Sequence, residues 1–147
     1  VVFDEGEEPR RLHLGRDIWG ETGTSVMAAL NGRVHSRAFN NHFGDYGATI
    51  ILEHEWRGFH FYSLYGHLAQ SDLDIEEGAD VRAGDTFAHF GPPAENGWWP
   101  PHLHLQLILD LGGRKGDYPG VCRYSERENW LSNCPDPNLL CQLYRYI

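Results

Sequence analysis

Short β-prone segments recur along this chain about every ten residues, and turn-forming residues separate them. The clearest are 48–55, which is rich in β-branched residues, 59–65, which follows a Trp-Arg-Gly turn, and 102–109. The 17 glycines and 8 prolines supply the turns, and only short segments have a helical pattern. This spacing predicts a mainly β fold, a twisted antiparallel β-sheet or sandwich with short helical turns.

A length of 147 residues suits one domain with a core of its own. We expect residues 1–147 to form that single domain, with the strand pattern confined to about 12–109. Beyond it, glycines make 110–147 irregular, so this part is predicted to be a C-terminal extension. Within the strand region, Asn31-Gly32 predicts a two-residue hairpin that pairs its flanking segments.

The formal net charge of −9 argues against a nucleic-acid partner or an anionic membrane partner, since both need a basic surface. No apolar run approaches the roughly 18 residues of a membrane-spanning helix.

The three cysteines are Cys122, Cys134 and Cys141, and no Cys-x-x-Cys pair occurs. A cysteine metal site is therefore not expected, and the pattern favours buried or half-buried thiols in a reducing compartment.

The stretch WWPPHLHLQL (98–107) alternates strictly after its two prolines, which mark the start of a strand. Successive side chains of a strand point to opposite faces, so the three leucines share one face. His102, His104 and Gln106 share the other. The segment alone leaves two readings open: a half-exposed edge strand with incidental polar residues, or a metal site.

Near the start of the chain, His13 and Asp17 offer two side chains that zinc binds well. Gly15 lies between them and favours an extended or looped segment over a helix. Zinc held by three protein side chains with a fourth position open is a catalytic arrangement. The same spacing also fits a surface loop in which Asp17 pairs with a nearby arginine.

Three motifs in order, HLGRD (13–17), YGHL (65–68) and PHLH (101–104), resemble those of the lysostaphin-type zinc endopeptidases. These enzymes cleave peptide bonds in bacterial peptidoglycan cross-links and, in some members, glycine-rich peptides. The resemblance runs from about Leu12 to Ile108 and includes the predicted order of strands. It implies the lysostaphin-type fold and a zinc-dependent endopeptidase that acts on a peptide substrate.

The resemblance also implies a role for each motif residue. His13, Asp17 and His104 correspond to the zinc ligands, while His102 and His67 correspond to catalytic imidazoles beside the metal. An imidazole there can take a proton from water or stabilise the tetrahedral oxyanion. Which of the two histidines does which stays open.

The loop 40–45 and the segment after Asp110 depart from the short forms of this family, and the loop 92–99 replaces its usual stretch of small residues. We expect the loops near 40–45 and 91–99 to wall the cleft. The Trp-Trp-Pro-Pro form and the tail 135–140 resemble peptidase-like domains of large bacterial proteins that also carry aminotransferase and phosphotransferase domains. The chain is accordingly predicted to be a module of such a protein. That resemblance favours the cytoplasm over the periplasm or secretion.

Two other functions compete with the enzyme. One is a non-catalytic relative that serves as a scaffold or a peptide-binding domain within a larger enzyme. The other is a carrier-type β-sandwich, suggested by the turn from Gly78 to Gly84, which needs a lysine at an exposed hairpin tip. Lys115, the only lysine, lies in a glycine-rich loop outside that setting. The intact set of five motif residues favours the enzyme.

Overall fold

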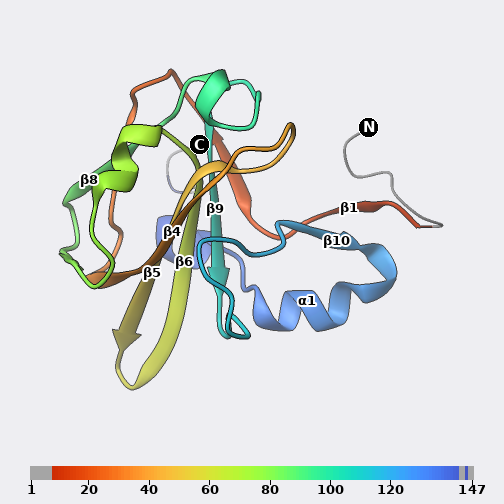
Figure 1. Ribbon diagram of the computed structural model, residues 1–147. Helices are drawn as coiled ribbons and strands as arrows, with labels where there is room; N and C mark the ends of the chain where they lie inside the picture. The colour runs from red at the N-terminus through yellow and green to blue at the C-terminus, as the bar shows by residue number, and fades with distance from the viewer. Residues whose placement is uncertain (1–7, 143–144, 146–147) are drawn as a thin grey trace.

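The computed structural model describes residues 8–142 and 145, and it confirms a mainly β fold built of antiparallel strands (Figure 1). A six-stranded sheet has the order β2-β9-β6-β5-β4-β7, and its strands are β2 (Arg16–Trp19), β4 (Gly32–Asn40), β5 (Gly47–Trp56), β6 (Phe59–Leu68), β7 (Asp80–Val81) and β9 (His102–Ile108). Two further pairs are β1 (Arg10–His13) with β10 (Val121–Arg123) and β3 (Ser25–Met27) with β8 (Thr86–His89).

The helical segments are short, as predicted. They are the 3₁₀ turns η1 (Gln70–Asp74), η2 (Pro93–Glu95) and η3 (Tyr124–Glu126), and the α-helices α1 (Arg127–Asn133) and α2 (Asn138–Cys141). Within the described part of the chain, no helix has the length and apolar character needed to cross a bilayer. The C-terminal extension predicted for 110–147 lies partly outside the described residues.

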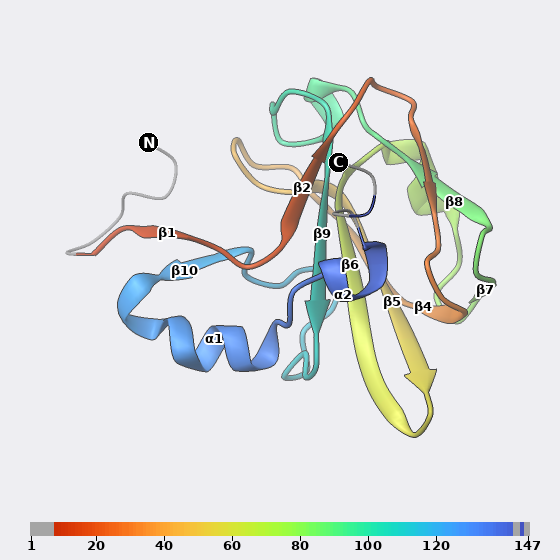
Figure 2. The ribbon, with the colours of Figure 1, turned by 180° about the vertical axis from the view of Figure 1, so that it is seen from behind.

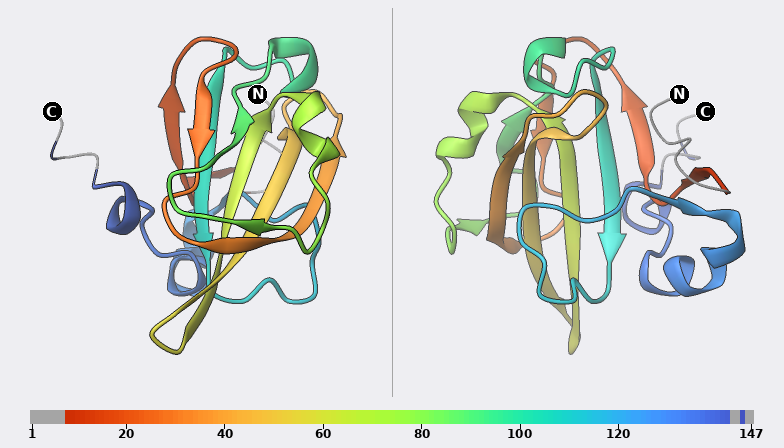
Figure 3. Two further views of the ribbon diagram at one scale, coloured as in Figure 1. Left: turned by 90° about the vertical axis from the view of Figure 1, so that its left-hand side faces the viewer. Right: turned by 45° about the vertical axis from the view of Figure 1, so that its right-hand side comes forward.

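Both faces of the central sheet are covered. Alternate residues of β5 show this, because Ile50 and Leu52 belong to one buried cluster and Ile51 belongs to another. The first cluster includes residues of β3 and β8. The second includes Cys122 and Cys134, which are buried free thiols. Both belong to the part of the chain from 110 to 142, which we call the C-terminal segment. Figure 3 (right) shows this segment, in light to dark blue, crossing in front of the sheet.

Strand β9 lies between β2 and β6, and all seven of its side chains are buried. The reading of this segment as a half-exposed edge strand is therefore wrong. The predicted alternation is correct, because Leu103 and Leu105 belong to the first core cluster. His102 and His104 point to the opposite face, which the C-terminal segment covers in part.

The hairpin predicted at Asn31-Gly32 is wrong. Residues 25–27 form β3, which pairs with β8, while β4 pairs with β5 and β7. The side-chain oxygen of Asn31 instead accepts a hydrogen bond from the backbone N–H of Ala83. The backbone carbonyl oxygen of Asn31 accepts one from His54 Nδ1. These contacts let the chain leave one sheet for another. By contrast, the turn at 56–58 does join β5 to β6, and Figure 2 shows that hairpin extending beyond the rest of the sheet.

The two long loops pack against each other through Gly97. Gly97 has φ +88°, and a Cβ atom there would lie 1.9 Å from the carbonyl oxygen of Asp45.

We expect Gly97→Ala to lower the free energy of unfolding by about 2–3 kcal/mol, because strain and a backbone clash combine. Gly84→Ala is the matched control, since Gly84 has φ +86° with open space around it. Urea unfolding should show the smaller loss of about 1 kcal/mol there, and equal losses would contradict the packing role.

Candidate metal centre and cleft

An open cleft with a volume of about 540 Å³ lies on the face of the sheet that carries the β9 histidines. Residues 42–46 and Trp99 border it, which confirms the prediction that both long loops wall the cleft. The C-terminal segment completes the wall with Arg114 and residues 117–121. All five motif residues line this cleft, namely His13, Asp17, His67, His102 and His104.

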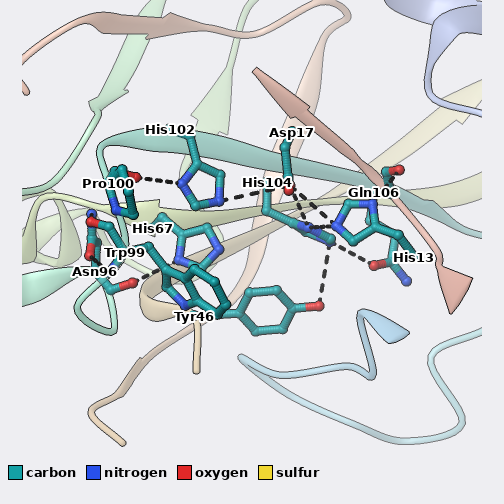
Figure 4. Close-up of polar contacts among 11 residues, drawn as sticks. His13, Asp17, Tyr46, His67, Asn96, Trp99, Pro100, His102, His104 and Gln106 are labelled. Atoms are coloured by element: carbon teal, nitrogen blue, oxygen red, sulfur yellow. Dashed lines mark hydrogen bonds and ion pairs between the residues drawn. The ribbon is translucent and has the colours of Figure 1, made fainter. Parts of the chain in front are cut away.

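Strand pairing explains how Asp17 meets His104. These two residues face each other directly across the antiparallel pair β2–β9 and so share one face of the sheet. Asp17 Oδ1 lies 3.2 Å from His104 Nδ1 and 3.2 Å from His13 Nε2, and the two imidazole nitrogens are 3.0 Å apart (Figure 4). The three residues form a group that could hold a metal ion.

Gly15 brings His13 to this group. The chain passes from β1 to β2 so close to His104 that a Cβ atom at position 15 would lie 2.6 Å from the carbonyl oxygen of Leu105 and 2.8 Å from the His104 ring. The Gly15 carbonyl also accepts a hydrogen bond from His13 Nδ1 over 2.8 Å, which leaves Nε2 to face the group. As predicted, the segment is extended and looped.

The charges of the group suit a cation. Burial raises the pKa of Asp17, but hydrogen bonds with His104 and His13 outweigh burial and hold that pKa well below its usual range. The carboxylate is therefore ionised at neutral pH. Burial lowers the pKa of His104, so its imidazole is neutral and keeps a lone pair. Burial lowers the pKa of His13, but its hydrogen bond to Asp17 and the charge of Asp17 outweigh burial and raise that pKa. Metal ions bind carboxylates and neutral imidazoles, so binding would release any proton that His13 carries.

His102 lies beside this group, two residues before His104 on the same face of β9. Its ring packs at an angle of 31° against Trp19, its partner across the β2–β9 pair, with centroids 4.5 Å apart. His102 Nδ1 donates to the carbonyl oxygen of Pro100 over 2.7 Å, because a carbonyl can only accept. The other nitrogen, Nε2, lies 3.8 Å from Asp17 Oδ1.

His67 reaches the cleft through a β-bulge. The pairing of β5 with β6 shifts register between Ala48 and Ile50, and His67 has φ +62°. Such bulges often re-aim a side chain next to an active site. Here the His67 ring comes to lie 4.2 Å from that of His102, centroid to centroid. Burial, followed by the neighbouring His102, lowers the pKa of His67 to about 3.

Asn96 is a residue of the site that the sequence did not reveal. The backbone carbonyl oxygen of Asn96 accepts a hydrogen bond from His67 Nδ1 over 2.7 Å. The side-chain amide of Asn96 is fully buried and bonds to the backbones of Gly91 and Trp99, which fixes the loop. Tyr46 was missed as well, although its buried ring lies against both His67 and His104. Loop residues of this kind carry no periodic signal.

An antiparallel β fold with a His, Asp and His group and two more imidazoles in one cleft is an arrangement that metallohydrolases use. The chain belongs to peptidase family M23, whose family model matches residues 11–116. This confirms the resemblance to the lysostaphin-type metallopeptidases and the prediction of a hydrolase.

Similarity to individual proteins agrees with the family. The chain is 31% identical over 108 residues to an L-Ala--D-Glu endopeptidase of Bacillus subtilis (strain 168), covering 70% of this chain and 31% of that protein. The chain thus spans about a third of the length of this relative.

Solved structures share the fold as well. One is the catalytic domain of the antimicrobial peptidase lysostaphin from Staphylococcus simulans, with a TM-score of 0.54, 22% identity and coverage of 87% of this chain and 88% of that one. Another is the catalytic domain of a mutant of the prophage-encoded M23 protein EnpA from Enterococcus faecalis. Its TM-score is 0.56, its identity is 22%, and 75% of this chain and 80% of that chain are covered.

Proposed function

We propose that this chain is a zinc-dependent endopeptidase that hydrolyses peptide bonds in peptidoglycan-type peptides, with His13, Asp17 and His104 as the zinc ligands. The observation that carries the proposal is the convergence of three ligand atoms, 3.0–3.2 Å apart, in a cleft with two further imidazoles. Membership of peptidase family M23 supports the same conclusion.

The donor set fits zinc. Tetrahedral zinc with ligand distances of about 2.0–2.1 Å separates its ligand atoms by roughly 3.3 Å, close to the three separations found here. Two neutral imidazoles and one carboxylate also leave a net positive charge on the ion. Zinc in such a site is a Lewis acid that polarises a carbonyl group and acidifies water.

We assign the proton transfers to His67 and His102. Each donates its Nδ1–H to a backbone carbonyl, of Asn96 and Pro100 respectively, so Nε2 is the nitrogen left without a proton in the neutral ring. Such a nitrogen can accept a proton from the attacking water, and the pKa of about 3 makes His67 a weak base in this step. Once protonated, the imidazolium can donate a hydrogen bond to the negative oxygen of the tetrahedral transition state.

The substrate class follows from the relatives. The curated relative is named for the bond between L-Ala and D-Glu, and lysostaphin is described as an antimicrobial peptidase. We therefore propose a stem peptide with an L-Ala–D-Glu bond as the first substrate to test, and a glycine-rich peptide as the second. The fused aminotransferase and phosphotransferase domains and the cytoplasmic location stay predictions.

Incubation of the zinc-loaded chain with each of these peptides, followed by mass spectrometry, tests the proposal. We expect cleavage at one defined peptide bond, loss of cleavage after removal of the metal with a chelator, and recovery when zinc is added back. The second candidate function is a peptide-binding scaffold, which the resemblance to domains of larger enzymes favours. Binding of either peptide without any cleavage by the zinc-loaded chain would contradict the endopeptidase and favour the scaffold.

A further inference from the structure

Gln106 is a buried amide that the proposed chemistry does not use. It lies two residues beyond His104 on the same face of β9, with no exposed surface. Burying an amide is unfavourable unless its donors and acceptor find partners. The partners of Gln106 are therefore informative.

Those partners fix which way the amide points. Gln106 Nε2 donates to the carbonyl oxygen of Pro119 over 3.0 Å and lies 3.5 Å from Cys134 Sγ. Because a carbonyl oxygen can only accept, the NH₂ group faces Pro119. The opposite end, Oε1, lies 2.9 Å from His104 Nε2 (Figure 4). An amide oxygen also only accepts, so His104 carries its proton on Nε2.

The tautomer of His104 has a direct consequence for the metal group. A neutral imidazole with its proton on Nε2 keeps its lone pair on Nδ1. Nδ1 is the nitrogen that lies 3.0 Å from His13 Nε2 and 3.2 Å from Asp17 Oδ1. The Tyr46 hydroxyl lies farther from His104 Nε2, at 3.4 Å, so Gln106 is the nearer partner.

We propose that Gln106 is a positioning residue for the metal centre, which fixes the tautomer and ring orientation of His104 and ties that ligand to the C-terminal segment. The inference rests on the proposed zinc site. Pro119 and Cys134 lie beyond residues 11–116, the part that the family model matches. The C-terminal segment thereby takes part in metal binding without supplying a ligand.

Zinc affinity, measured by competition with a chromophoric chelator, tests the role of Gln106. Gln106→Met keeps the length of the side chain but removes its polar atoms, and we expect zinc affinity to fall about 10–100-fold. Gln106→Glu keeps an acceptor for His104, so its affinity should lie closer to that of wild type. Circular dichroism and the thermal midpoint check that each variant is folded.

Ser63→Ala is the matched control. Ser63 is also fully buried in the sheet and hydrogen-bonded, to His54 over 2.7 Å and to Tyr65 over 3.2 Å, but it does not line the cleft. We expect its zinc affinity to stay within about two-fold of wild type, as for distant independent sites. A loss as large as that of Gln106→Met would mean that any buried polar change weakens the site, which would overturn the proposal.

Other outcomes are equally decisive. Wild-type affinity in Gln106→Met, or equal losses in Gln106→Met and Gln106→Glu, would overturn the role of Gln106 while leaving the zinc site intact. A wild-type chain that takes up no zinc would overturn both.

If the variants do not fold, long-range ¹H–¹⁵N spectra of the wild-type chain decide. They should show His104 protonated on Nε2, and a proton on Nδ1 would contradict the proposal.

Discussion

Replacing His104 with alanine should abolish zinc binding under conditions in which the wild-type chain is fully loaded. Zinc sites built from protein side chains gain several kcal/mol from each ligand, so we expect the affinity to fall by about 10²–10³-fold or more. His104 is the buried member of the group, and its Nδ1 lies within 3.2 Å of both His13 and Asp17. Elemental analysis after dialysis gives the stoichiometry, and chelator competition gives the affinity.

His102→Ala is the matched control for this loss. His102 is as buried as His104 and lies on the same face of the same strand, so the two substitutions remove the same volume from neighbouring positions. We expect His102→Ala to bind one zinc per chain, because its ring nitrogens face Pro100 and Asp17 from outside the ligand group. Equal loss of zinc in both variants would show that the division into ligand and catalytic residue is wrong.

Replacing His67 or His102 with alanine should lower the rate of peptide hydrolysis by about 10²–10⁴-fold while zinc stays bound. That is the usual contribution of a general acid or base. His67 and His102 lie with their rings 4.2 Å apart, and a backbone carbonyl holds the Nδ1–H of each. Initial rates of His67→Ala and His102→Ala on the peptide that the wild type cleaves give the effect on kcat.

His60→Ala serves as the control for these rates. His60 lies on β6 like His67, but its half-exposed side chain is near Glu53 at the far end of the hairpin. We expect its rate to match that of the wild type. Wild-type rates in His67→Ala or His102→Ala would remove the catalytic role of that histidine, and a loss in His60→Ala of the same size would point to a general defect.

Regular alternation made the centre of the fold predictable. In β9 the period of two separates leucines from histidines, and the structure keeps that separation. The alternation could not tell that β9 is an interior strand, because that depends on β2 pairing with it from a distant part of the chain. The same distance explains why the Asn31-Gly32 hairpin failed. A local turn signal was overridden by the pairing of β3 with β8.

The convergence of the candidate ligands was predictable where short motifs resemble those of the family. The spacing from His13 to Asp17 and from His102 to His104 places each pair, and strand pairing then joins the two. His67 was placed beside the metal only by the resemblance of its YGHL motif. Its aim depends on a bulge and a positive φ, which the alternation of β6 does not predict.

The contribution of the C-terminal segment was not predictable either. It acts through single contacts such as that of Pro119 with Gln106, and its irregular glycine-rich start gives no period from which to read a pairing. The pairing of β10 with β1, the strand that ends at His13, likewise joins opposite ends of the chain.

X-ray absorption at the zinc edge, combined with an anomalous difference map from crystals of the zinc-loaded chain, tests the central claim most directly. We predict one zinc per chain, with nitrogen and oxygen neighbours at about 2.0–2.2 Å, two of them imidazoles. The anomalous peak should lie among His13, Asp17 and His104. Zinc with sulfur neighbours, a peak elsewhere in the molecule, or no uptake of zinc would contradict the account.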